Sequence, residues 1–318
     1  MFDQLKNESI DDGVDRRGFL ECMAWAGTGL LWTLNGGLPA GRVFGQDARR
    51  AGPNDFSFVQ ISDSHIGFGK EPNKDVVGTL RAAVAKINAL PQPPAFVLHT
   101  GDLTHLAKAE EFDTVAEVLK ALKTRVFYVP GEHDFESDDN KLYLERYGRG
   151  TMGTGWYSFD YNGAHFVGLV NVANAKSGSM NGLGQLGKEQ LQWLSKDLAN
   201  VSNSKPIVVF AHVPLWAVYE KWGWGTKDAE QALTLLKRFG SVTILNGHIH
   251  QIMQKVEGRV VFHAARSTAF PQSEPGKGSP GPIRDFPADR LRGALGVTTV
   301  GYVENRGHLA VADPTLES

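Results

Sequence analysis

The chain has 318 residues, 42% hydrophobic and 21% charged, a composition typical of a globular enzyme and unlike that of a disordered chain. Its 33 lysines and arginines nearly balance 35 aspartates and glutamates, so charge gives no reason to expect nucleic acid or an anionic membrane as a partner. The only cysteine is Cys22, which excludes an internal disulfide and favours nitrogen and oxygen atoms as ligands for any metal.

The N-terminal segment resembles a twin-arginine export signal. Arg16 and Arg17 stand within Asp-Arg-Arg-Gly-Phe-Leu, and a mildly apolar stretch follows them. That stretch is interrupted by Glu21 and is too short for a membrane span, which needs about 20 predominantly apolar residues. We expect residues 1–45 to be the signal, residues 46–54 to be a linker, and the twin-arginine machinery to export the protein to the periplasm or beyond. The alternative is a chance arginine pair before a core helix.

The expected catalytic domain, residues 55–318, begins with strands that alternate with helices. Apolar runs and helical spacing predict, in chain order, a strand at 55–61, a helix at 76–90, a strand at 95–99, a helix at 110–122 and a strand at 125–129. Prolines stop the first helix. This alternation is typical of a mainly parallel sheet, whose loops gather at one edge.

The rest of the chain predicts a second sheet that packs against the first. Asn162-Gly163 is a strong two-residue turn signal between strands at 155–161 and 164–171. Further elements are expected as a helix at 187–198, a strand at 205–210, a helix at 228–239 and strands at 242–246, 260–263, 297–304 and 308–311. Residues 271–287, rich in Pro, Gly and Ser, form a loop that is either a lid or a plain surface excursion.

Five short blocks of polar residues lie directly after apolar runs in the sequence. They are Asp63-Ser64-His65, Gly101-Asp102, Gly131-Glu132-His133-Asp134, Ala211-His212 and Gly247-His248-Ile249-His250. Carboxylate oxygens and imidazole nitrogens suit zinc, iron and manganese, and loops at the ends of neighbouring strands bring such ligands together. The pattern therefore predicts a dinuclear metal site and metal-assisted hydrolysis.

These blocks resemble the signature of the calcineurin-like metallophosphoesterases, which runs D-x-H, G-D, G-N-H-[DE], a lone His and G-H-x-H. The resemblance covers residues 56–263. It implies an α/β fold, a four-layer α-β-β-α sandwich with two mixed β-sheets and two metal ions, iron, zinc or manganese, at the strand ends. It also implies a hydrolase of phosphoric esters in which a metal-bridging hydroxide attacks phosphorus. A metal-dependent amidase or lactonase would usually carry an H-x-H-x-D-H block, which the sequence lacks.

The resemblance assigns a role to each polar residue of the blocks. The first metal would be bound by Asp63, His65 and His250, the second by His212, His248 and the residue at 132, and both by Asp102, with one carboxylate oxygen on each ion. The catalytic pair would be His133, which protonates the leaving oxygen or stabilises the phosphoryl group, and Asp134, which orients the loop.

Glu132 departs from the family pattern, which usually has Asn as a neutral ligand of the second metal. A carboxylate there would bind the ions more tightly or favour a trivalent one, and would raise the pKa of the bridging water. Alternatively, Glu132 turns away and leaves the second metal one ligand short. A further alternative is a non-catalytic recognition module that binds metal but has lost most catalysis.

His105 is the second departure. Phosphoprotein phosphatases of this superfamily carry G-D-x-x-D-R-G, in which the second Asp supports the catalytic His, whereas this chain has His105 there and no Arg-Gly after it. A small phosphate ester is therefore favoured as substrate over a phosphoprotein, while monoester and diester remain open because specificity lies in the loops. His105 either supports a metal ligand or has a merely structural role.

Two further sets of side chains have alternative interpretations. Aromatic residues after the lone-histidine block either form a lid that stacks on a base or phenyl ester or anchor a loop as buried side chains: Trp216, Tyr219, Trp222 and Trp224. Two arginines are candidate phosphate contacts, with surface charge as the alternative: Arg266 and Arg284.

Overall fold

The computed structural model describes residues 52, 54–135, 140–176, 179–180, 182–304 and 309–317. The predicted signal at 1–45, and nearly all of the predicted linker at 46–54, lie outside the described residues. Residues 49–318 belong to one compact unit. Within the described ranges, no helix combines the length and the apolar character needed to cross a membrane.

The first sheet has five strands and carries the first three polar blocks. Its order is β13 (Ala310–Ala312), β12 (Thr298–Tyr302), β1 (Phe56–Ile61), β2 (Val97–His99) and β3 (Val126–Tyr128). The strands β1, β2 and β3 run parallel, whereas β12 runs antiparallel to both β1 and β13. Because parallel strands end at the same edge, the loops after β1, β2 and β3 meet there.

The second sheet has six strands and carries the remaining two blocks. Its order is β10 (Met253–Glu257), β11 (Val260–Ala264), β9 (Val242–Asn246), β8 (Ile207–Phe210), β5 (Ala164–Gly168) and β4 (Tyr157–Tyr161). Its four central strands are parallel, and an antiparallel strand lies at each edge. The short strands β6 (Ala175–Lys176) and β7 (Ser179–Met180) pair separately.

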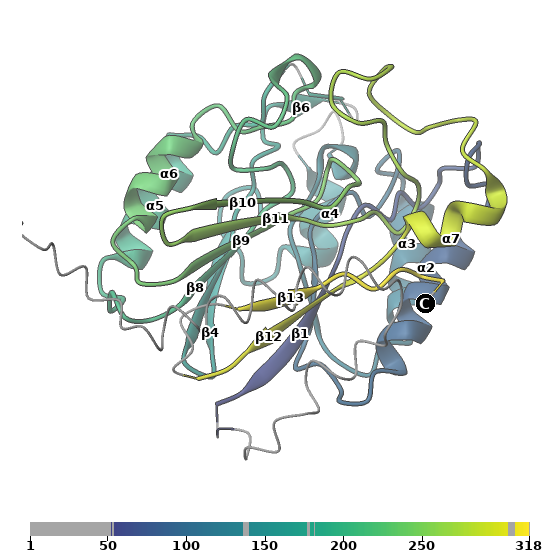
Figure 1. Ribbon diagram of the computed structural model, residues 1–318. Coiled ribbons are helices and arrows are strands. Elements are labelled where there is room, and N and C mark those ends of the chain that lie inside the picture. Colours follow the sequence, from purple (N-terminus) through teal and green to yellow (C-terminus); the bar gives the residue numbers. More distant parts are fainter. Residues whose placement is uncertain are drawn as a thin grey trace, which may run out of the picture. The chain divides into compact units, whose positions relative to one another are not determined.

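Helices cover the outer faces of the two sheets. Helices α2 (Val76–Asn88) and α3 (Ala109–Leu119) pack on the first sheet, and α5 (Lys188–Leu198) and α6 (Ala229–Leu236) pack on the second, on opposite sides of the sandwich (Figure 1). A third core lies between the sheets, where the rings of Phe58 and Phe166 meet edge to face at 5.4 Å. Burying each such ring contributes about 2 kcal/mol. The predicted four-layer α-β-β-α sandwich is confirmed.

Local sequence signals explain where several elements begin and turn. The side chain of Asp75 accepts a hydrogen bond from the amide of Gly78 at 2.8 Å and caps α2. Asn162 and Gly163 both have positive φ, as the predicted hairpin turn between β4 and β5 requires. Elements that the sequence did not predict are α4 (Lys141–Tyr147), α7 (Leu291–Ala294), the pair β6 and β7, and β10.

Candidate metal centre

The structure brings all seven predicted metal ligands to one end of the two sheets. Each lies shortly after the end of a parallel strand: Asp63 and His65 after β1, Asp102 after β2, Glu132 after β3, His212 after β8, and His248 and His250 after β9. All seven side chains are buried, and Glu132, at 8%, is the most exposed. Strand order therefore accounts for their proximity.

The backbone of these loops is unusual. Five of the seven residues have a left-handed conformation: Asp63, His65, Asp102, His248 and His250, with φ between 41° and 70°. This conformation costs a residue other than glycine about 1 kcal/mol. Main-chain hydrogen bonds hold it, because the amide of Asp63 donates to Gly101 O at 3.0 Å and the amide of His65 donates to Asp102 O at 2.9 Å. The loops thus turn successive side chains toward one centre.

Two glycines allow these loops to approach closely. A Cβ atom at Gly101 would lie 2.6 Å from His212 Nδ1, and one at Gly131 would lie 2.1 Å from Asp102 Oδ1. Neither position can hold a side chain without moving a candidate ligand. The Gly that precedes the acidic residue in both blocks is therefore required by packing inside the site.

Asp63, His65 and His250 form the first candidate ligand triad. Asp63 Oδ1 and His65 Nε2 each lie 3.2 Å from His250 Nε2. His250 Nδ1 donates to the carbonyl of Phe270 at 2.6 Å, so the lone pair of its Nε2 faces the other two ligands. Burial, together with the neighbouring His133, holds the pKa of His65 well below its usual value, which favours the neutral form that binds metal.

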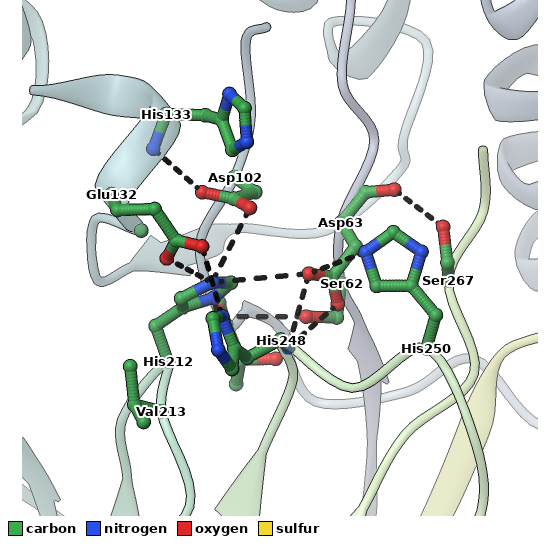
Figure 2. Close-up of polar contacts among 12 residues, drawn as sticks. Ser62, Asp63, Asp102, Glu132, His133, His212, Val213, His248, His250 and Ser267 are labelled. Carbon is green, nitrogen blue, oxygen red and sulfur yellow. Dashed lines mark hydrogen bonds and ion pairs between the residues drawn. The ribbon is translucent and has the colours of Figure 1, made fainter. Parts of the chain in front are cut away.

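Glu132, His212 and His248 form the second candidate triad (Figure 2). Glu132 Oε2 lies 2.9 Å from His212 Nε2, and its Oε1 lies 2.9 Å from His248 Nδ1. Among the described residues, Glu132 Oε2, His212 Nε2 and His248 Nδ1 nevertheless lack a hydrogen bond. Buried acceptor atoms that converge without hydrogen-bonding fit a shared cation. Glu132 therefore turns into the site, and the alternative orientation away from it is not observed.

Asp102 lies between the two triads. Its Oδ2 is 3.4 Å from His65 Nε2 and 3.3 Å from His212 Nε2, whereas its Oδ1 accepts a hydrogen bond from the amide of His133 at 2.9 Å. That each carboxylate oxygen of Asp102 serves one ion stays a prediction. A single oxygen faces both triads, because the main chain of the next loop already engages the other.

The pKa values of the cluster reflect its mixed charge. Burial alone would raise the pKa of Asp63, but His250 and His212 lower it to about 2. Burial would lower the pKa of His212, but Asp102 and Glu132 raise it well above its usual value. The carboxylates of the cluster thus favour positive charge at this end of the site, which a bound metal ion would supply in place of a proton.

His133 and Asp134 have different surroundings. His133 Nδ1 donates to the carbonyl of His105 at 2.8 Å, and its ring meets the ring of His65 edge to face at 4.8 Å. Asp134 is almost fully buried and accepts hydrogen bonds from the amides of Leu103, Thr104 and Gly131. Burial and Asp102 raise the pKa of Asp134 to about 7, while these donors act in the opposite direction. Asp134 therefore joins two loops and does not face the centre.

Several supporting contacts could not be recognised in the sequence. The hydroxyl of Ser267 donates to Asp63 O at 2.7 Å, and the carbonyl of Thr100 accepts from His212 Nδ1 at 2.8 Å. The side-chain Nε2 of Gln272 donates to His248 O at 3.1 Å, which ties the start of the 271–287 loop to the site. Such contacts use a main-chain atom or a common polar residue, so no residue type marks them.

Among the remaining candidates, Trp224 and Arg266 contact groups outside the seven predicted ligands. Trp224 is 2% exposed and packs with Ile249 and Ala264, as expected of a side chain that anchors its loop. Arg284 is exposed, whereas Arg266 is half-buried and donates to the carbonyl of Ala294 at 3.4 Å. The interpretation of a buried side chain that anchors its loop therefore fits Trp224. The contacts of the two arginines do not indicate a phosphate-binding site.

Comparisons with known proteins agree with this arrangement. A probable glycerophosphodiester phosphodiesterase GpdQ of Arcobacter nitrofigilis is 27% identical over 66% of this chain and 77% of its own length. A probable cyclic nucleotide phosphodiesterase of Rhodopseudomonas palustris is 27% identical over 67% and 78%, respectively. A dimetal phosphatase from Danio rerio shares the fold, with a TM-score of 0.60 and 16% identity over 82% of this chain and 96% of its own. The family model for calcineurin-like phosphoesterases matches residues 56–252, so the chain belongs to this family of phosphoester hydrolases.

Proposed function

We propose that the protein hydrolyses small phosphodiesters with two metal ions held by the seven buried ligands. The observation that carries the proposal is the pair of triads, each with one carboxylate and two imidazoles, that meet at Asp102 Oδ2. Donor sets of this kind suit iron, zinc or manganese. When bound, two such cations polarise the phosphoryl oxygens and lower the pKa of the attacking water.

His133 is the proposed acid of the reaction. Its Nδ1 is engaged with His105 O, and its amide is engaged with Asp102 Oδ1, so the ring is held beside the bridging carboxylate. Burial would lower the pKa of His133, but Asp102 and Glu132 raise it above its usual value. A protonated imidazole in this position stabilises the charged phosphoryl group or donates its proton to the leaving oxygen.

Charge at the centre favours a diester over a monoester. Glu132 adds a third carboxylate to Asp63 and Asp102, so two bound ions offer less net positive charge than they would with a neutral amide ligand. This loss weakens binding of a dianionic monoester more than that of a monoanionic diester. The names of two relatives that align over about two thirds of this chain, both phosphodiesterases, also support this choice.

The direct test combines metal analysis with two model substrates. The purified mature domain, residues 46–318, is assayed against bis-p-nitrophenyl phosphate and p-nitrophenyl phosphate, with Asp102→Ala as the matched control. Two bound ions and Asp102-dependent turnover that is faster on the diester support the proposal. Faster turnover of the monoester contradicts the substrate class, and two ions without turnover on either ester favour the recognition module.

We also propose export through the twin-arginine route. The support is the Asp-Arg-Arg-Gly-Phe-Leu sequence at residues 15–20, and this route carries folded proteins, so metal can be loaded before transport. The test replaces Arg16 and Arg17 with Lys and follows the protein in cell fractions. Export of the double variant at the normal rate contradicts the proposal.

A further inference from the structure

His105 lies between the loop that carries His65 and the loop that carries His133. Its amide donates to the carbonyl of Ile66 at 2.9 Å, and its carbonyl accepts from His133 Nδ1 at 2.8 Å. The next amide, that of Leu106, donates to the buried carboxylate of Glu111 at 2.8 Å. The backbone of His105 is therefore fixed on both sides, and its ring has a defined place.

The ring of His105 packs against the rings of both histidines. It stacks on the ring of His133, with centroids 4.9 Å apart and an angle of 14° between planes, and it meets the edge of Phe68 at 5.2 Å. Its Nδ1 lies 3.5 Å from Nδ1 of His65. The ring thus faces the nitrogen of His65 that points away from the proposed metal.

This contact matters because the two nitrogens of His65 have different tasks. Its Nε2 faces His250 Nε2 at 3.2 Å and Asp102 Oδ2 at 3.4 Å, at the centre of the site. A neutral imidazole that binds metal through Nε2 carries its proton on Nδ1, and that proton needs an acceptor. Nδ1 of His105, at 3.5 Å, can accept it when the proton of the His105 ring is on Nε2.

We propose that His105 is a positioning residue that holds His65 in the metal-binding tautomer and orientation. The role differs from that of the Asp found at this place in related phosphoprotein phosphatases, whose side chain supports the catalytic histidine. Here the main-chain carbonyl of His105 takes over the contact with His133, and the side chain serves His65 instead. The inference rests on the proposed function only in taking His65 as a metal ligand.

The experiment compares two substitutions that separate hydrogen bonding from packing. His105→Phe keeps an aromatic ring beside His133 but has no acceptor, whereas His105→Asn loses the ring and offers an amide oxygen; both keep the main-chain carbonyl. Zn²⁺ affinity of the purified full chain is measured by equilibrium competition with a chelator. We expect His105→Phe to lower the affinity for one of the two Zn²⁺ ions by about 10–100-fold. His105→Asn is expected to restore most of the lost affinity.

The control is His165→Gln, which removes a histidine near the start of β5 that is paired with Asp160 and Asp197 and is not among the seven ligands, and which should leave Zn²⁺ affinity unchanged. If His105→Phe does not fold, His105→Ala replaces it in the comparison with His105→Asn. Wild-type affinity in the variant without an acceptor overturns the proposal, as does equal weakening in His105→Asn, which would mean that only packing matters. Two ions bound with His105-dependent affinity but without ester hydrolysis would contradict the proposed function and leave this inference standing.

Discussion

Two clusters of histidine and carboxylate, the buried candidate metal ligands and the partly exposed set around His165, differ in how their atoms face one another. At His165, on β5, Nδ1 lies 2.8 Å from Asp160 Oδ1 and Nε2 lies 2.9 Å from Asp197 Oδ2, so both ring nitrogens donate to carboxylates. In the candidate metal centre, Glu132 and His212 approach equally closely, at 2.9 Å, but without forming a hydrogen bond.

The comparison teaches that orientation, and not composition, marks a metal site. His212 directs Nδ1 to a main-chain carbonyl and leaves Nε2 free to face other acceptors, which is the arrangement of a ligand. Both ring nitrogens of His165 donate to carboxylates, and one of these carboxylates also binds Lys205. This is the arrangement of a charged imidazolium in an ion-pair network. A list of nearby residue types would not separate the two.

Removing the carboxylate shared by both triads should break the metal centre and leave the His165 cluster intact. Asp102→Ala is expected to lose both ions and to lower kcat/KM by roughly a thousandfold or more, because metal coordination supplies several kcal/mol of transition-state stabilisation. Metal analysis and steady-state kinetics measure the effect. Retention of two tightly bound ions would mean that Asp102 Oδ2 does not bridge the triads.

Removing the proposed acid should separate catalysis from metal binding. His133→Asn is expected to keep two ions while kcat falls by about a hundredfold or more, since a positioned acid typically contributes 10²–10⁴-fold. Metal content and kcat are measured on the same sample. A variant with unchanged kcat would show that His133 takes no part in the reaction.

Replacing Glu132 should change the charge of the candidate metal centre without loss of the bound ions. Glu132→Asn is expected to keep two ions and to move the pH optimum downward by about one unit, because one carboxylate fewer lowers the pKa of the attacking water. The ratio of diester to monoester turnover should fall in the same variant. The pH profile is compared with that of the wild type, and an unchanged profile would argue against Glu132 as a ligand.

The smallest effect is expected on the free energy of unfolding, from a substitution in the His165 cluster. Burial would lower the pKa of His165, but Asp197 and Asp160 raise it, so the folded state binds this proton more tightly than the unfolded state does. The resulting stabilisation is fully present below about pH 6.5 and is lost as pH rises through the raised pKa of the folded state. His165→Gln should therefore cost about 1 kcal/mol at pH 6 and less at pH 8. Denaturant unfolding at both pH values tests this, and an equal loss at both would contradict it.

The sequence predicts much of this molecule because its strongest signals are local. Apolar runs such as Val242–Asn246 mark central strands, and polar residues placed directly after them become neighbours through strand order alone. By contrast, β10 was missed because it is an edge strand with only one partner and a mostly exposed surface. Helix α4 has only Tyr143 buried, so it shows little apolar periodicity.

The geometry of the site could not be predicted for a different reason. The contacts that orient its ligands come from residues far away in sequence, such as Ser267 for Asp63 and the carbonyl of Phe270 for His250. Nothing in the motif tells which oxygen of Asp102 faces the two triads, since that depends on the amide of His133 in another loop. These details follow from packing between the sheets.

The left-handed backbone of the ligand loops has a consequence for stability. Glycine would adopt the conformation at His65 or His248 without strain, and asparagine with less strain than most residues, so substitutions that relieve the backbone also delete a ligand. Stabilising this end of the sandwich by such substitutions would therefore cost the candidate metal site.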